Sequence, residues 1–297
     1  GVVSGNGASL VSNGSGTLVL TGVNTYNGTT NIGTGNTLQI GNGSVNGSIA
    51  NTSSITNNGT LVFDQVSGNT TNVSQTISGS GNLTQMGSGS TVILTGANTY
   101  SGITTISAGT LQIGNGSVNG SIASSSSIVN SGTLMFDQAS GNTTSLTGVV
   151  SGTGNLSQIG AGSTLVLLGA NTYTGATTVT AGTLVVGNGT TSGALGLGNI
   201  TVSNANLTFN YSSGTYTFGN STSTAYLSLN NANVSVLGGS VTLAGYTSVS
   251  GTLSSDVIAV NLSGTNNLTA ASGASLNLLG NTLGTNSSSI AMQNNSV

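Results

Sequence analysis

Residues 37–50 read TLQIGNGSVNGSIA, and residues 110–123 repeat them letter for letter. The same step along the chain leads from LVFDQVSGNTT at 61–71 to LMFDQASGNTT at 134–144. A fixed period of this kind, here about 73 residues, is the signature of a repeat architecture. The whole chain should therefore be interpreted as a tandem array.

A third copy begins at residue 148, where GVVSG repeats the first five residues. The period also persists where the wording has diverged, since Phe63, Phe136 and Phe209 are separated by the same step. We predict three tandem units, followed by a diverged β-rich segment that continues the same fold or forms a capping or assembly element. Their bounds are 1–74, 75–147, 148–220 and, for the diverged segment, 221–297.

Each unit divides into shorter steps. A Thr-Leu-x-aliphatic phrase recurs at Thr17, Thr37 and Thr60, and again at the equivalent positions of the second unit. The steps are unequal but close to about 20 residues, the length of one coil of a β-solenoid, which predicts about 12–15 coils in all.

Within the phrases the side chains alternate with a period of two. In residues 59–64, Leu61 and Phe63 are expected to point inward, while Thr60, Val62 and Asp64 point outward. Asn-Gly, Ser-Gly and Gly-Ser pairs between the phrases supply the corners. The predicted fold class is all-β, a parallel β-helix in which stacked coils share one aliphatic core.

Charge is almost absent from the chain. It has no Lys, Arg, His or Cys, and its three carboxylates are Asp64, Asp137 and Asp256. General acid–base catalysis, activated nucleophiles, nucleic-acid binding, Cys-ligated zinc and disulfides all need side chains that are missing here. We therefore predict that the protein is not an enzyme, with no catalytic, cofactor-binding or metal-binding residues and no cofactor.

Asp64 and Asp137 are the only charges that recur with the repeat. They could form a stacked cation site along one face, or simply be two solvated outward residues beside an inward Phe. The equivalent position of the third unit is Asn210, which favours the second interpretation because a site that needs charge should keep it.

Tyrosines recur as well. Tyr26, Tyr100 and Tyr173 share an Asn-Thr-Tyr motif and are expected to stack as a sparse aromatic column, which either packs at a corner or forms a sugar-binding strip. A second aromatic group could mark a subunit contact or a wider core. Its members are Phe209, Tyr211, Tyr216, Phe218, Tyr226 and Tyr246.

Asn-x-Ser/Thr triplets are frequent, and each is formally a glycosylation acceptor. In a chain so rich in Asn, Ser and Thr, such triplets also arise by chance. Examples are Asn13, Asn27, Asn42, Asn46, Asn69 and Asn82.

Two long stretches carry a family resemblance. Residues 79–116 and 152–189, with a weaker copy at 14–43, resemble the passenger-associated strand repeat of bacterial autotransporters. The resemblance implies a right-handed β-helical passenger that is exported across the outer membrane and often serves adhesion, aggregation or biofilm formation. The family commonly has Lys after the Leu-Thr pair, whereas this chain has Gln85 and Gln158.

Two functions stay open. One is a structural subunit of an extracellular filament, sheath or surface layer. The near-absence of repelling charge favours this function, as does a first residue that already belongs to the repeat. The other is an autotransporter-like adhesin passenger that acts as a monomeric rod. We expect an extracellular or bacterial cell-surface location, a mature product or fragment, and copies of itself as partners, with surface glycans as a further class. Nucleic acid and membrane insertion are not expected.

Two other functions on the same fold are disfavoured. Ice binding by flat rows of Thr is disfavoured because uneven coil steps should scatter such rows. A polysaccharide lyase or hydrolase is rejected because its acidic and basic side chains are absent. The scarcity of titratable groups also predicts a stability that barely depends on pH between about 2 and 10.

Overall fold

A computed structural model of the chain contains 28 strands and no helix within the residues it describes. These residues are 1–49, 52–122, 127–218, 227–230, 232–244, 260–263, 266–270, 275–279 and 290–294. The chain forms two compact units, which we describe separately. The first comprises Gly1–Asn142 and Gly148–Gly154, and the second Thr143–Thr147 and Asn155–Val297.

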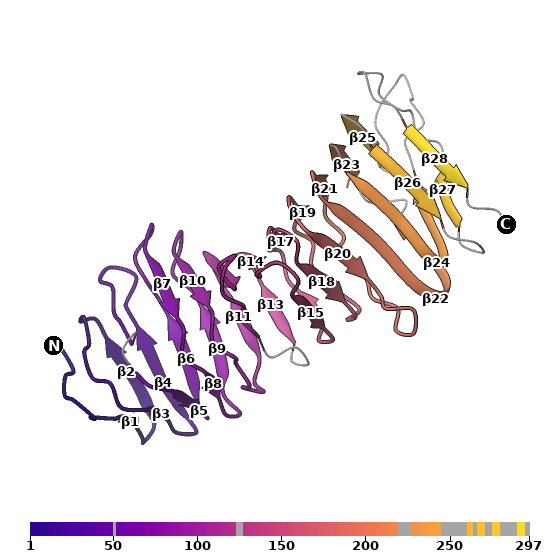
Figure 1. Ribbon diagram of the computed structural model, residues 1–297. Helices are drawn as coiled ribbons and strands as arrows, with labels where there is room; N and C mark the ends of the chain where they lie inside the picture. The colour runs from indigo at the N-terminus through magenta and orange to yellow at the C-terminus, as the bar shows by residue number, and fades with distance from the viewer. Residues whose placement is uncertain are drawn as a thin grey trace, which may run out of the picture. The chain divides into compact units, whose positions relative to one another are not determined.

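In the first unit the strands form three groups of parallel neighbours (Figure 1). Sheet I contains β1 (Leu10–Ser12), β3 (Thr30–Ile32), β5 (Ile55–Asn57) and β8 (Ile77–Ser78). Sheet II contains β2 (Gly16–Leu20), β4 (Asn36–Ile40), β6 (Thr60–Phe63), β9 (Asn82–Gln85), β11 (Thr104–Ile106), β13 (Ile128–Asn130) and β16 (Val150–Ser151). Sheet III contains β7 (Thr70–Val73), β10 (Thr91–Leu94), β12 (Thr110–Ile113) and β14 (Thr133–Phe136).

In the second unit the strands form two such groups. Sheet IV contains β17 (Asn155–Gln158), β19 (Thr177–Val179), β21 (Ile200–Ser203), β23 (Leu227–Asn230) and β25 (Val260–Ser263). Sheet V contains β15 (Thr143–Leu146), β18 (Thr164–Leu167), β20 (Thr183–Val186), β22 (Asn206–Phe218), β24 (Asn233–Ala244), β26 (Asn266–Ala270) and β28 (Ile290–Asn294), and β27 (Ser275–Leu279) also pairs with β24.

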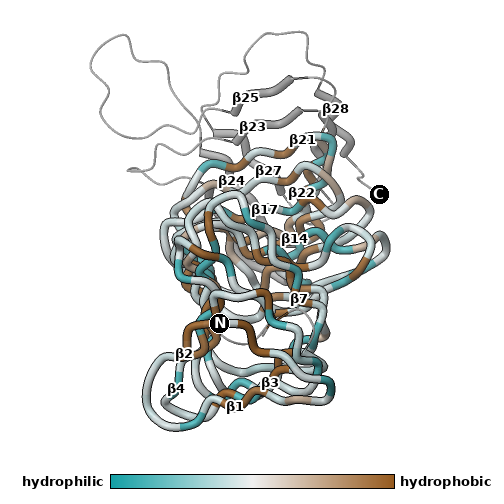
Figure 2. The backbone as a smooth tube through the Cα atoms, turned by 90° about the vertical axis from the view of Figure 1, so that its left-hand side faces the viewer, coloured by the Kyte–Doolittle hydropathy of each residue, from teal (hydrophilic) through white to brown (hydrophobic). Residues whose placement is uncertain are grey.

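Each strand pairs with the strand one coil away, as a β-solenoid requires. In sheet II, Leu38, Leu61 and Leu83 are direct partners, and all three side chains have 0% exposure. The predicted all-β, parallel β-helical fold is thus confirmed, as is the inward direction of Leu61 and Phe63. In Figure 2, strands such as β1 and β2 carry apolar segments, and much of the remaining described tube is more polar.

Glycine makes the sharp corner after β4. Gly41 has φ +83°, a left-handed conformation in which a side chain is strained, and a Cβ there would collide with the Asp64 carbonyl of the next coil. The corner between coils therefore depends on a residue without a side chain.

Equivalent strands of successive repeats fall in different sheets. In sheet II, the residues aligned with Leu38 in the three following coils are Leu61, Leu83 and Thr104, in that order. The counterpart of Leu38 in the next sequence repeat is instead Leu111, which lies beyond Thr104 in the chain and belongs to sheet III. Each repeat thus consists of three coils plus one additional strand.

Coils lengthen along the second unit. Ile200 of β21 pairs with Leu227 of β23, which in turn pairs with Val260 of β25. Both coils are therefore longer than the predicted step of about 20 residues. Sheet II stacks seven successive strands in the first unit and sheet V stacks seven in the second, one strand per coil. In the diverged segment, the described strands continue the parallel pairing of sheets IV and V.

Candidate functional site

Rows of threonine run along the outer faces of the sheets. In sheet III, Thr70, Thr91, Thr110 and Thr133 are consecutive register partners, each one strand spacing from the next. The coils between them differ in length, but the loops absorb the difference and leave the strands aligned. The expectation that uneven coil steps scatter the threonines is therefore wrong.

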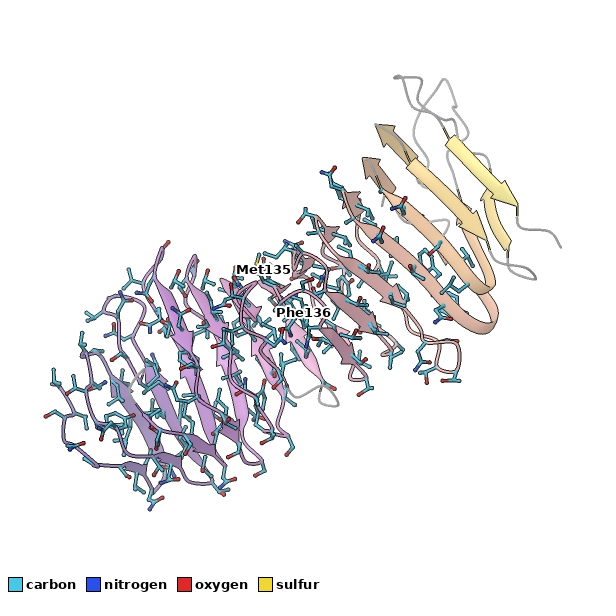
Figure 3. All side chains as sticks on the ribbon, viewed as in Figure 1. Met135 and Phe136 are labelled. Carbon is cyan, nitrogen blue, oxygen red and sulfur yellow. The ribbon has the colours of Figure 1, made fainter. Side chains whose placement is uncertain are left out.

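The second outward row of each sheet is mixed. In sheet III it includes Met135, which points away from the core, whereas its neighbour Phe136 points into it (Figure 3). In sheet II it includes Val19 and Val129, which are 42% and 41% exposed. No ionisable side chain lies on these strands in sheets II and III, so their outer faces are rich in hydroxyls and uncharged.

In the second unit, neighbouring outward side chains bond to one another along sheet V. The amide of Asn233 donates to Asn206 Oδ1 at 2.8 Å, and the amide of Asn206 donates to Thr183 Oγ1 at 3.2 Å. Such a ladder adds polar cohesion between coils on top of the backbone hydrogen bonds.

Asp64 and Asp137 do not form a shared site. Asp64 follows β6 in sheet II and Asp137 follows β14 in sheet III, so the interpretation as a stacked cation site along one face is wrong. Each carboxylate instead accepts a hydrogen bond from a glutamine of the preceding coil, Gln39 at 3.0 Å and Gln112 at 3.2 Å. Partial burial raises the pKa of the Asp137 carboxyl.

A buried glutamine next to each aspartate holds the loop of the preceding coil. Gln65 Oε1 accepts the Gly47 amide at 3.0 Å, while its Nε2 donates to the Gly47 carbonyl and to Thr71 Oγ1, both at 2.9 Å. Gln138 holds Gly120 in the same way, at 2.9 and 2.8 Å. We call this arrangement the glutamine clamp.

Sequence reasoning missed the glutamine clamp, although two signals were present. Gln65 and Gln138 occupy the same repeat position, directly after the aspartate, and both belong to a repeated Phe-Asp-Gln phrase. In the third repeat Tyr211 stands at this position, and its hydroxyl donates to the Gly193 carbonyl at 3.4 Å. The interaction therefore persists with a different side chain.

A second pair of buried glutamines, at the positions where the family commonly has Lys, is less well satisfied. Gln85 Nε2 donates to Ser90 Oγ at 2.9 Å and Gln158 Nε2 to Ser163 Oγ at 2.9 Å. In both side chains Oε1 is buried without a hydrogen-bond partner. The surroundings of each of these glutamines thus supply hydroxyl and carbonyl oxygens that accept from Nε2, but no N–H or O–H group that donates to Oε1.

The three Asn-Thr-Tyr tyrosines belong to the core. Their exposures are 1%, 2% and 0% for Tyr26, Tyr100 and Tyr173, which rules out a sugar-binding strip and confirms packing. Each hydroxyl pairs with the threonine four residues later, at 2.8, 2.7 and 2.6 Å. Burial raises the pKa of Tyr173 to about 12. These threonines lie in sheets I, II and IV, so the expected aromatic column is wrong because the repeat advances by one strand.

Part of the second aromatic group is also core. Phe209 and Tyr211 are buried and stack with ring centroids 6.2 Å apart. The side chains of Tyr216 and Phe218, and the residues Tyr226 and Tyr246, lie outside what the structure describes.

Several candidate glycosylation asparagines have structural roles through their amide oxygens. Asn42 Oδ1 accepts the Ser44 and Val45 amides, and Asn46 Oδ1 accepts the Val66 amide of the next coil. Asn27, Asn69 and Asn82 also accept hydrogen bonds through Oδ1, whereas Asn13 is exposed.

Among the described residues, no cluster of three or more His, Cys, Asp or Glu could hold a metal, and no helix is suited to cross a membrane. What the outer faces offer is dense, neutral hydrogen bonding in a fixed register. Such a surface offers many hydroxyl and amide groups for hydrogen bonding and few charges.

Comparison with known proteins agrees with this architecture. A family model for the passenger-associated-transport-repeat matches residues 10–40, 83–113 and 156–186. These three segments are passenger-associated-transport repeats. Each one spans four strands, and the first begins in sheet I while the second begins in sheet II. The one-strand advance is therefore visible in the placement of the repeats themselves.

One relative is the adhesin BmaC autotransporter of Brucella suis biovar 1 (strain 1330). It is 54% identical to this chain over 59 residues, which is 20% of this chain and 2% of the relative's length. No solved structure matches the chain. The chain thus carries three segments that match this family model, and it is similar over a short stretch to a small part of a very long adhesin autotransporter.

Proposed function

We propose that this chain is a stalk segment of an autotransported surface adhesin, located outside the cell, and that its coils act as a structural spacer rather than as an enzyme. Three passenger-associated-transport repeats and the local identity to an adhesin autotransporter support this assignment. The absence of Lys, Arg, His and Cys from the whole sequence supports a non-enzymatic role.

The glutamine clamp is the observation that carries the proposal. Gln65 and Gln138 are 1% exposed and direct their amides to the loop of the preceding coil, and the buried amides of Asn24, Asn98 and Asn171 donate to carbonyls of the following coil. A side chain fully used in holding coils together is unavailable for a ligand, so the geometry favours mechanical continuity over recognition within the coils.

The stalk proposal can be tested in the producing bacterium. An in-frame deletion of residues 10–186, which carry the repeats, is compared with replacement by unrelated β-solenoid coils of equal number. We expect the deletion to shorten the distance between an antibody label and the outer membrane, and the replacement to restore both distance and adhesion. Loss of adhesion with the distance restored would contradict the spacer role.

A second candidate function is association between copies of the chain, in a filament, sheath or aggregate. The uncharged outer face of sheet II favours it, because two such faces meet without repulsion and each exposes apolar side chains such as Val129. In this function the threonine rows of one copy would lie against those of another.

Sedimentation velocity tests self-association directly. We expect concentration-dependent association that persists from low to about 1 M salt, since no charges drive it. The change Val129→Lys, on the outer face of sheet II, should abolish it, while Val118→Lys, which is in a loop and 51% exposed, should not. Equal effects of the two changes, or a monomer at every concentration, would refute this function.

A further inference from the structure

The outer face of sheet V carries two rows of hydroxyl, amide and aliphatic side chains in strict register from β15 to β24. None of these side chains is ionisable, and each coil contributes one residue to each row. We call the two rows together the hydroxyl face. The first row is Thr143, Thr164, Thr183, Asn206 and Asn233, and the second is Ser145, Val166, Val185, Thr208 and Ser235.

The rows stay aligned although the coils differ in length. Successive members of the first row are 21, 19, 23 and 27 residues apart in the sequence, yet each is the direct register partner of the next. The objection to ice binding, that uneven coil steps scatter the threonines, therefore does not hold for this face.

The side chains of the hydroxyl face are held in place. Thr and Val are branched at Cβ, which restricts χ1 and leaves few orientations to a row of them. The hydroxyls of Thr208 and Ser235 are hydrogen-bonded at 2.9 Å, and the amide of Asn206 donates to Thr183 in the other row. The residues are exposed or half-buried, except for Val166, which is 9% exposed. A surface ordered before it binds pays less entropy when it meets an ordered partner.

The spacing and chemistry of this face suit crystalline water. Neighbouring coils are about 4.8 Å apart, close to the repeat of water molecules along one axis of hexagonal ice. Threonine presents a hydroxyl that bonds to a lattice water and a methyl group that fits between waters, and valine presents methyl groups alone. An uncharged face can lie against a neutral solid without stripping the hydration shell from an ion, which would be costly.

The threonine row of sheet III lacks this uniform surrounding. Its second row contains Ile93, Gln112 and Met135, whose side chains differ in length and polarity. Thr91 and Thr110 of sheet III nevertheless occupy the same repeat positions as Thr164 and Thr183, 73 residues earlier in the sequence. Sheet III therefore supplies a matched control for each central threonine of the hydroxyl face.

We propose that the hydroxyl face of sheet V binds ice, a function beyond that of a spacer. The ligand is the surface of an ice crystal, held by two rows of side chains at the strand spacing rather than by a pocket. The chain would thereby attach its bearer to ice as well as extend an adhesin.

Partition of the full chain into slowly growing ice tests the proposal. We expect the chain to be enriched in the ice relative to an inert protein of similar size. Thr164→Tyr and Thr183→Tyr each raise a ring above the hydroxyl face and should abolish the enrichment, whereas Thr91→Tyr and Thr110→Tyr should not. Circular dichroism of all four variants establishes that they are folded. Exclusion of the wild-type chain from the ice, or equal losses in the two pairs of variants, would overturn the proposal.

A second copy of the chain is the other partner that such a face could take, and sedimentation velocity distinguishes it. If the wild-type chain associates, Thr164→Tyr makes it monomeric and ice excludes both, the hydroxyl face is a contact between copies and the proposal is wrong. Enrichment of a monomeric wild-type chain in ice, lost in Thr164→Tyr and kept in Thr91→Tyr, would support it.

Discussion

The two kinds of buried glutamine should respond in opposite ways to the same change. Gln65 and Gln85 are 1% and 0% exposed, and Met has nearly the shape of Gln without its polar atoms. Gln65 makes three hydrogen bonds and satisfies both polar groups of Gly47. Gln85 Nε2 donates to Ser90 Oγ at 2.9 Å and, over a longer 3.3 Å, to the Gly87 and Ser90 carbonyls, while its buried Oε1 has no partner.

The magnitudes follow from what each change leaves behind. Gln65→Met strands the Gly47 amide and carbonyl, and an unsatisfied buried group costs about 1–3 kcal/mol. Since Gly47 is half-buried and water can reach part of it, we expect a total loss near the lower end, about 2–3 kcal/mol. Gln85→Met strands little, because Ser90 Oγ keeps its bond to the Gly87 carbonyl, and it removes the unsatisfied oxygen. Its net effect should lie within about 1 kcal/mol of zero.

Urea unfolding followed by circular dichroism measures both effects on the full chain. Gln138→Met serves as a second copy of the clamp variant, and Gln158→Met as a second copy of the neutral one. Solenoids can unfold in segments, so the comparison uses each variant's shift in the urea curve against the same wild-type curve. If the Gln85 variant loses as much stability as the Gln65 variant, burial rather than hydrogen bonding decides, and the reasoning fails.

Three other predictions concern the backbone and the core. Gly47→Ala should cost about 3 kcal/mol or more, because its Cβ would overlap the Leu20 carbonyl, whereas Gly68→Ala, with φ +80° and open space, should cost about 1 kcal/mol; urea midpoints compare them. Burial raises the pKa of Tyr173 to about 12, so the neutral hydroxyl contributes fully to the free energy of unfolding below pH 10. As the pH rises toward 12, the free energy of unfolding should fall by about 2–3 kcal/mol. A thermal midpoint that does not change below pH 10 is the control. Tyr100→Phe should cost about 1 kcal/mol in the same urea assay, and no measurable loss would show that the hydroxyl bond is dispensable.

The strands and their facing could be predicted because they depend on local pattern. Leu61 and Phe63 occupy alternate positions of a short phrase, and glycine corners separate phrases of this kind, so the parallel solenoid follows from the sequence. Val62 between them, predicted to point outward, is only 7% exposed. The scarcity of charged residues likewise leads to the prediction of a protein that is not an enzyme, and this stays a prediction. These inferences need no knowledge of how one coil meets the next.

The stacking could not be predicted because it depends on the sum of the loop lengths. Three coils from Leu38 end at Thr104, short of its sequence counterpart Leu111, and nothing local shows this difference. It separates Asp64 from Asp137 and removes the expected tyrosine column. The glutamine clamp was missed for the same reason, since Gln65 meets a loop 18 residues earlier in the chain. The division into units 1–74, 75–147 and 148–220 stays a prediction.

The one-strand advance has a consequence for how such a chain can evolve. Recombination between identical segments such as 37–50 and 110–123 adds or removes one whole repeat. Because the repeat is not a whole number of coils, each such event shifts every later strand to the neighbouring side of the solenoid. A surface patch recognised by an antibody or a phage would thus move to another side of the solenoid without any substitution. Three successive gains or losses of a repeat would return the patch to its original side.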